Sequence, residues 1–129
     1  MRHMRWGWIL VAGLLGEFVA IVFLEGLRLL HGGWLAPLSP VGSAAFQFEM
    51  FAGMALCGWW VARKTTAWPV LNGALVGVTA VLIYEMLAFG QPVPRNWFYF
   101  VAHGLKIGGG AAGGWLAAWR ARAPVSASA

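Results

Sequence analysis

The chain has 129 residues, of which 60% are hydrophobic and only 10% are charged. A soluble domain is usually about 45–50% apolar and about 25% charged, and a fold this small could not bury the apolar surplus. The composition therefore excludes an ordinary soluble domain and predicts an integral membrane protein with the lipid bilayer as its solvent. The net charge is +5, but the basic residues flank apolar runs and form no patch, so we expect no nucleic-acid partner.

Four apolar runs are long enough to cross a bilayer, which takes about 20 mostly apolar residues. Because the runs are continuous and lack the period-two alternation of membrane strands, they predict α-helices. The predicted fold is an all-α membrane protein with a four-transmembrane-helix bundle as its single domain, over residues 1–122. A disordered C-terminal tail is expected over residues 123–129. The four spans are expected at about residues 6–30, 41–62, 68–89 and 97–119.

The breaks between the runs contain residues that end helices. Glycines and prolines fill the first and third breaks, and Arg63 to Thr66 make up the second. Pro69 is expected in the first turn of the third helix, where its missing N–H costs nothing. Nearly all of the nine tryptophans lie near a predicted helix end, as an interfacial aromatic belt would require.

The basic residues outside the runs predict the orientation in the membrane. One side would hold six of them, and only Arg28 and Arg95 would lie on the other side. Cytoplasmic loops carry the excess of lysine and arginine, so both termini and the middle loop are expected in the cytoplasm (N-in/C-in), in the cell inner (plasma) membrane. The six are Arg2, Arg5, Arg63, Lys64, Arg120 and Arg122.

The two halves of the chain resemble each other at an offset of 60 residues, which predicts an internal repeat of two similar helical hairpins. Both halves would begin in the cytoplasm, so the repeat would be parallel. The matched residues are Trp8, Gly13, Leu15, Ala20, Glu25 and Leu27 with Trp68, Gly73, Leu75, Ala80, Glu85 and Leu87.

All four acidic residues of the chain lie inside the predicted spans: Glu17, Glu25, Glu49 and Glu85. A charge at the centre of a membrane helix costs about 2.5–3.5 kcal/mol on insertion scales. Such a group must therefore pair, take up a proton or face a water-filled path. These intramembrane glutamates are the strongest functional signal in the sequence.

Helical rise places the ionisable residues in two layers. Glu17, Glu49 and Lys106 fall near the middle of the bilayer, and we expect them to form an ion, proton or substrate site with Lys106 as the counter-charge. The alternative is a structural salt bridge that locks the bundle. A second layer toward the outer face would hold Glu25, Glu85 and His103 and form an outer vestibule.

The outer layer has alternative interpretations. Arg28 can pair with Glu25 at i, i+3 on one helix, and His103 can be a core histidine. Glu25, Glu85 and His103 together could bind a divalent metal, but no spacing motif supports this, so a metal remains unknown.

Catalysis finds no support in the sequence. Cys57 is the only cysteine, and no nucleophile arrangement, phosphate loop or haem motif is present, so we expect no catalytic residue and no cofactor. Small residues at Gly109 and Gly113, and at Gly110 and Gly114, predict close helix packing, either within the chain or between subunits of a homo-oligomer.

Three functional hypotheses follow. The first is a small proton- or cation-coupled transporter or channel, with a small ion or small molecule as its substrate. The second is a non-catalytic accessory or assembly subunit of a membrane complex, whose buried glutamates pair with partner helices. The third is an intramembrane enzyme that uses the outer glutamate and histidine cluster with a metal.

Overall fold

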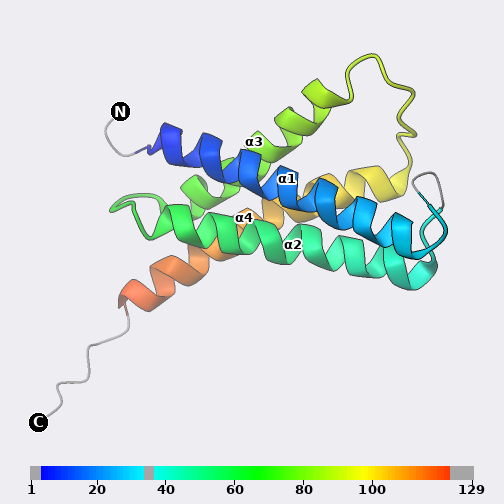
Figure 1. Cartoon of the computed structure of the whole chain (residues 1–129). Helices are drawn as coiled ribbons and strands as arrows, with labels where there is room; N and C mark the ends of the chain where they lie inside the picture. Colours follow the sequence, from blue (N-terminus) through cyan, green and yellow to red (C-terminus); the bar gives the residue numbers. More distant parts are fainter. Residues whose placement is uncertain (1–3, 34–36, 123–129) are drawn as a thin grey trace, which may run out of the picture.

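The computed structural model describes residues 4–33 and 37–122, and all regular structure in this part of the chain is helical. Consecutive helices run in opposite directions, so the start of the first and the end of the last lie at the same end of the bundle (Figure 1). The predicted disordered tail lies outside the described residues. The helices are α1 (Trp6–Leu30), α2 (Pro40–Ala62), α3 (Pro69–Leu87) and α4 (Trp97–Arg122).

The predicted all-helical fold with four helices is confirmed, and two helix ends differ from the prediction. α3 ends at Leu87 and not at residue 89, because the chain turns at Gly90, whose φ of 76° is a conformation that glycine adopts without strain. α4 continues past residue 119 to Arg122, because Arg120, Ala121 and Arg122 are good helix formers and nothing interrupts them.

Helix starts follow local chemistry. Ser39 caps α2 by accepting a hydrogen bond from the backbone N–H of Gly42 at 3.0 Å. Pro69 is the first residue of α3, as predicted. Trp68 before it has a left-handed backbone, with φ of 56°, and the buried side-chain amide of Asn72 donates hydrogen bonds to the carbonyls of Ala67 and Trp68 at 3.2 and 3.0 Å. Asn72 thus stabilises a left-handed backbone conformation that an aromatic residue rarely adopts.

Glycines bring α4 into close contact with two other helices. Gly109 and Gly113 lie against α2, and Gly110 and Gly114 lie against α3. A Cβ atom on Gly113 would overlap the carbonyl oxygen of Ala55, and the other three glycines face backbone just as closely. The small residues therefore pack within the chain, and each of the two predicted pairs contacts a different helix.

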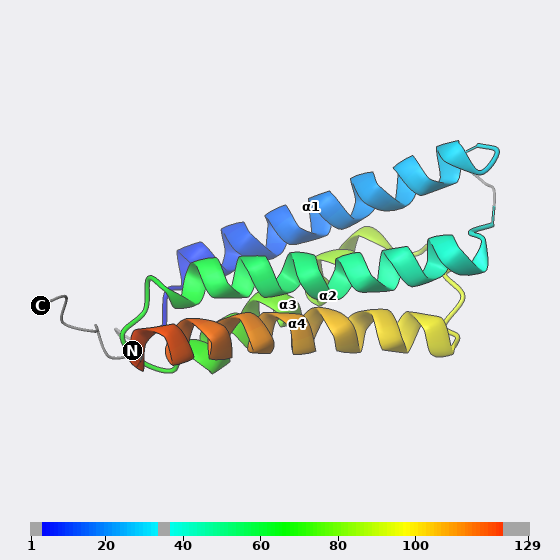
Figure 2. The same cartoon turned by 90° about the horizontal axis from the view of Figure 1, so that it is seen from below.

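Helix α1 lies across α2 and α3, diagonally opposite α4. Within the described helices, no Cα atom of α1 comes within 8 Å of a Cα atom of α4. Figure 2 shows α2 between them. Apolar side chains fill the half of the bundle nearer the chain ends. This buried apolar cluster consists of Ile9, Ala12, Met54, Val61, Val76 and Ala80.

The outer surface of the bundle is strongly apolar. Leu14, Phe18 and Val22 on α1 are each more than half exposed, and large apolar side chains on the other helices are exposed in the same way. α1 and α3 are the described helices long and apolar enough to cross a membrane, with mean hydropathies of 2.2 and 1.8. Only 33% and 28% of the most apolar 18-residue stretch of each helix is buried, whereas the core helices of soluble proteins are mostly buried.

Helices α2 and α4 do not reach the same apolarity, so the predicted bundle of four membrane-spanning helices is not confirmed. The reason lies in their composition, since α4 is rich in glycine and carries Lys106, and α2 carries Gln47 and Glu49. Small and polar residues lower mean hydropathy even where the helix packs against its neighbours.

Replacement of Gly113 by alanine should destabilise the bundle by about 1–3 kcal/mol, because the new methyl group would overlap the backbone of α2. Gly104→Ala is the matched control in the same helix, since nothing lies within 4 Å of that position, and it should be neutral or slightly stabilising. Denaturant titration of the purified protein measures both. Equal stability of the two variants would contradict the close approach of α4 to α2.

Candidate functional site

A buried ion pair joins the two diagonal helices. The Nζ of Lys106 on α4 donates to a carboxylate oxygen of Glu17 on α1 at 2.6 Å, and each side chain is only 3% exposed. Charges at this depth are strongly destabilised unless they are paired. The predicted sharing of one layer by Glu17 and Lys106 is therefore confirmed as a direct contact.

Two features of the fold let Lys106 reach Glu17. The carbonyl of Lys106 lies so close to Gly77 on α3 that a Cβ there would overlap it, so the backbone of α4 sits deep in the bundle. The Nζ of Lys106 also lies 4.9 Å from the ring centroid of Tyr84, within cation–π range. The ammonium thus has a carboxylate and an aromatic face as partners in a buried site.

Glu49 is the third member of the predicted inner site. Its carboxylate folds back along α2 over Gly53, where a Cβ would lie 2.8 Å from one of its oxygens. The other oxygen is buried and has no hydrogen-bond partner among the described residues. Both Glu17 and Lys106 are near enough to act on Glu49 electrostatically, but neither makes a direct bond to it. The inner site is therefore a contact pair with a second carboxylate close by.

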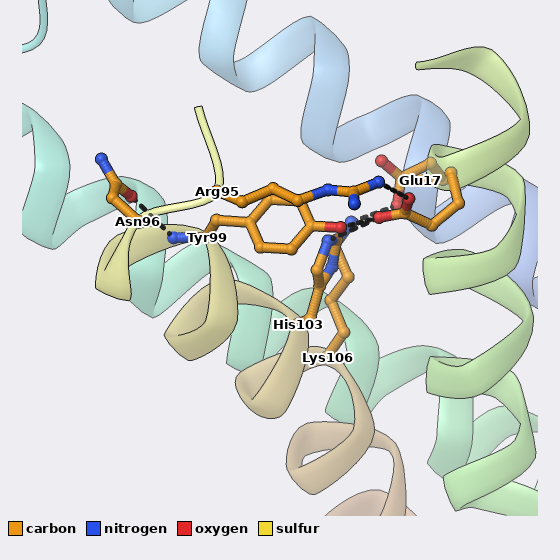
Figure 3. Close-up of polar contacts among 7 residues, drawn as sticks. Glu17, Arg95, Asn96, Tyr99, His103 and Lys106 are labelled. Atoms are coloured by element: carbon orange, nitrogen blue, oxygen red, sulfur yellow. Dashed lines mark hydrogen bonds and ion pairs between the residues drawn. The ribbon is translucent and has the colours of Figure 1, made fainter. Parts of the chain in front are cut away.

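A second polar cluster forms around Glu85 at the end of the bundle away from the chain ends. The Tyr99 hydroxyl donates a hydrogen bond to the Glu85 carboxylate. Arg95 and His103 lie 3.6 and 3.5 Å from the Glu85 carboxylate, the histidine outside hydrogen-bonding geometry. Figure 3 shows Arg95, Tyr99 and His103 converging, with Lys106 nearby. The predicted association of Glu85 with His103 is present.

Glu25 is not brought into this cluster. Its carboxylate accepts a hydrogen bond from Arg28 at 2.9 Å along α1, which is the i, i+3 pairing that the sequence allowed. In the described residues, no ion pair or hydrogen bond joins Glu25 to Glu85 or His103. The same part of the chain also contains no group of three or more histidine, cysteine or acidic side chains placed to hold a metal ion.

A cavity of about 260 Å³ is lined by Glu17 and Lys106 of the inner pair and by Tyr99 and His103 of the outer cluster, whereas Glu49 and Glu85 do not line it. Its deep wall includes Glu17, Met50 and Lys106, and its outer wall includes Arg28 of α1, Leu38 and the segment before α4. The buried apolar cluster and the glycine contacts of α4 lie between the ion pair and the end of the bundle that holds the chain ends. The cavity is therefore closed at its inner end by the Glu17–Lys106 pair.

Three residues of the site were not predicted from the sequence: Tyr84, Tyr99 and Arg95. The rings of Tyr84, Tyr99 and His103 pack against one another, with centroid distances from His103 of 5.1 Å to Tyr84 and 4.3 Å to Tyr99 and with 6.2 Å between the two tyrosines. The sequence could have indicated that Tyr99 belongs to the site, because Tyr99 and His103 are at i, i+4 on one helix face. No such signal marks Arg95, which reaches Glu85 only because of how the loop before α4 folds.

Glu17→Met and Lys106→Met should each destabilise the protein by about 3–5 kcal/mol, because each removes the direct partner of a buried charge. The double variant removes both charges and should recover most of that loss. Denaturant titration of all four proteins closes this double-mutant cycle. Additive single effects would show that the two side chains do not depend on each other.

Comparison of the chain with protein-family models, with curated proteins and with solved structures gives no match. The geometry of the site is therefore the basis of any functional assignment.

Proposed function

We propose that this protein moves protons or small cations across the cell inner membrane, with Glu17, Glu49 and Lys106 as the site. The observation that carries the proposal is the buried Glu17–Lys106 pair at the closed end of a cavity. A pair that only locked helices together would have no need of an open approach from one side. Intramembrane ionisable residues that line a cavity mark ion and proton pathways in membrane proteins.

The proposal includes four membrane spans with both termini in the cytoplasm. The exposed apolar surface and the hydropathy of α1 and α3 support membrane insertion. Four antiparallel helices with both chain ends on one side fit an even number of crossings (Figure 1). The excess of arginine and lysine at that end supports a cytoplasmic location for it. The Glu85 cluster would then face the outside.

The chemistry of the site follows from one lysine near two carboxylates. A proton or a cation that reaches Glu17 neutralises its charge and releases Lys106 from the pair. The freed ammonium needs another anion, because an unpaired charge is costly at this depth. Glu49 has a buried carboxylate oxygen with no partner and lies within electrostatic range. Exchange of Lys106 between Glu17 and Glu49 would therefore couple ion binding at Glu17 to a change of ion pairing within the inner site.

The outer cluster serves as the entrance in this proposal. The Glu85 carboxylate is 34% exposed and attracts cations, and Arg95 and Tyr99 hold it in position. Both ring nitrogens of His103 are buried without a hydrogen-bond partner in the described residues. They are free to accept or pass on a proton, or to bind water, between Glu85 and the inner pair.

Proteoliposomes loaded separately with dyes sensitive to protons, sodium and potassium should show flux of at least one of these ions above that of empty liposomes under an imposed gradient. Glu17→Gln and Glu49→Gln should each lower that flux at least about tenfold, because a neutral amide cannot titrate or pair with Lys106. Glu25→Gln is the matched control, since this carboxylate pairs along its own helix away from the inner pair, and it should keep flux within about twofold.

Correctly folded wild-type protein that carries none of the three ions would contradict the transport proposal. A stable complex with other membrane proteins would then favour the accessory-subunit hypothesis. Flux that persists in folded Glu17→Gln and Glu49→Gln proteins would show that the ions take another route.

Glu85→Gln should change the entrance and leave the inner step intact. Loss of about 1 kcal/mol of attraction at a partly solvated carboxylate corresponds to about a fivefold rise in the half-saturating ion concentration. The maximal rate should stay close to that of the wild type. Initial rates measured over a range of ion concentrations separate the two quantities, and a drop in maximal rate alone would place Glu85 in the transfer step.

A further inference from the structure

A second hollow lies at the opposite end of the bundle, where the chain begins and ends. It has a volume of about 640 Å³ and is formed by the end of α2, the α2–α3 turn and the end of α4. It shares no lining residue with the cavity above the Glu17–Lys106 pair. Its polar lining consists of Trp59, Arg63, Thr65, Thr66, Arg120 and Arg122.

Three guanidinium groups surround this hollow without an acidic partner. In residues 4–33 and 37–122, Arg63, Arg120 and Arg122 make no ion pair, and all four glutamates of the chain lie elsewhere. A cation at a helix C-terminus is favourable by itself, which accounts for each arginine separately. Three of them around one hollow produce a concentrated positive potential that only a bound anion would neutralise.

Two of these arginines share one aromatic ring. The guanidinium carbon of Arg63 lies 4.6 Å from the ring centroid of Trp59, and that of Arg120 lies 5.7 Å from the same centroid. Arg63 follows the last residue of α2 and Arg120 lies on α4, so one indole ring brings two like charges from different segments to the same hollow. An anion in the hollow would offset the repulsion between these like charges, and guanidinium groups donate paired hydrogen bonds to the oxygens of such an anion.

Uncharged donors complete the hollow. The Thr65 hydroxyl already donates its proton to the carbonyl of Ala62 at 2.9 Å, so the free hydroxyl donor at the rim is that of its exposed neighbour Thr66. The indole N–H of Trp59 is buried and has no acceptor among the described residues. A buried donor without an acceptor costs free energy, so a ligand or water that supplies an oxygen atom at this site is favoured.

We propose that this hollow binds a phosphate group. A phosphate has the negative charge and the several acceptor oxygens that three arginines and a hydroxyl rim recognise. Basic pockets between helix ends on the cytoplasmic side bind the headgroups of anionic lipids, and a free phosphate ion offers the same chemistry. The inference concerns only this end of the bundle and does not depend on transport through the other cavity.

The test uses the purified full chain in an uncharged detergent. Phosphatidylglycerol, phosphatidylcholine and inorganic phosphate are titrated separately, with bound lipid counted by native mass spectrometry and the thermal unfolding midpoint as the second readout. We expect phosphatidylglycerol to bind and stabilise and phosphatidylcholine to do neither. If inorganic phosphate stabilises the protein as well as phosphatidylglycerol does, the ligand is a free anion. If phosphatidylglycerol stabilises the protein and inorganic phosphate does not, the ligand is a lipid headgroup.

Arg63→Gln/Arg120→Gln should weaken phosphate-group binding at least about tenfold, because it removes both guanidinium groups beside Trp59. Arg5→Gln is the matched control, since Arg5 lies at the same end of the chain but does not line the hollow. Equal binding by the two variants would overturn the proposal, as would equal binding of the two lipids by the wild type. If the double variant does not fold, Arg122→Gln alone is compared with Arg5→Gln by the same measurements.

Discussion

The contact between Lys106 and Glu17 depends on how deeply α4 sits between α2 and α3. Seven glycines on these three helices remove the side chains that would hold the backbones apart: Gly58, Gly73, Gly77, Gly109, Gly110, Gly113 and Gly114. Only with α4 at this depth can a lysine side chain reach the helix diagonally opposite. Tight glycine packing and a charged centre thus belong to one arrangement, in which the backbone contacts position the charge and the ion pair joins α1 to the rest.

The sequence predicted the helices well because hydrophobic run length and helix-ending residues are local properties. Pro69 began α3 as expected, and the glycine pairs of α4 found close partners. Counting helical rise also put Glu17 and Lys106 at the same depth, which was sufficient to predict their pairing. Rise along a helix gives depth but not rotation, and for this reason Glu25 was expected in the outer cluster, whereas its helix face leaves it with Arg28.

What the sequence could not predict depends on loops and on aromatic geometry. Arg95 lies near Glu85 because of the path of the loop between α3 and α4, and no periodic pattern in the sequence predicts the path of a loop. Nothing in the sequence marks Tyr84 and Tyr99 as site residues, yet both rings contact His103, and the ring of Tyr84 also faces Lys106. The internal repeat stays a prediction, and the two equivalent glutamates differ in their surroundings, since Glu25 pairs along its helix and Glu85 pairs across the bundle.

The two ends of the bundle are chemically different, and this asymmetry supports the functional proposal. One end has the Glu85 carboxylate with its tyrosine and histidine neighbours, near the buried Glu17–Lys106 pair. The other end has three arginines around a separate hollow. The central claim is that Glu17 gains and loses charge as the protein works. Infrared difference spectroscopy of the reconstituted protein during acidification tests this most directly. The account predicts a protonated-carboxyl band that disappears in Glu17→Gln and remains in Glu25→Gln; an identical spectrum for the wild type and Glu17→Gln would contradict it and leave the pair as a structural tie.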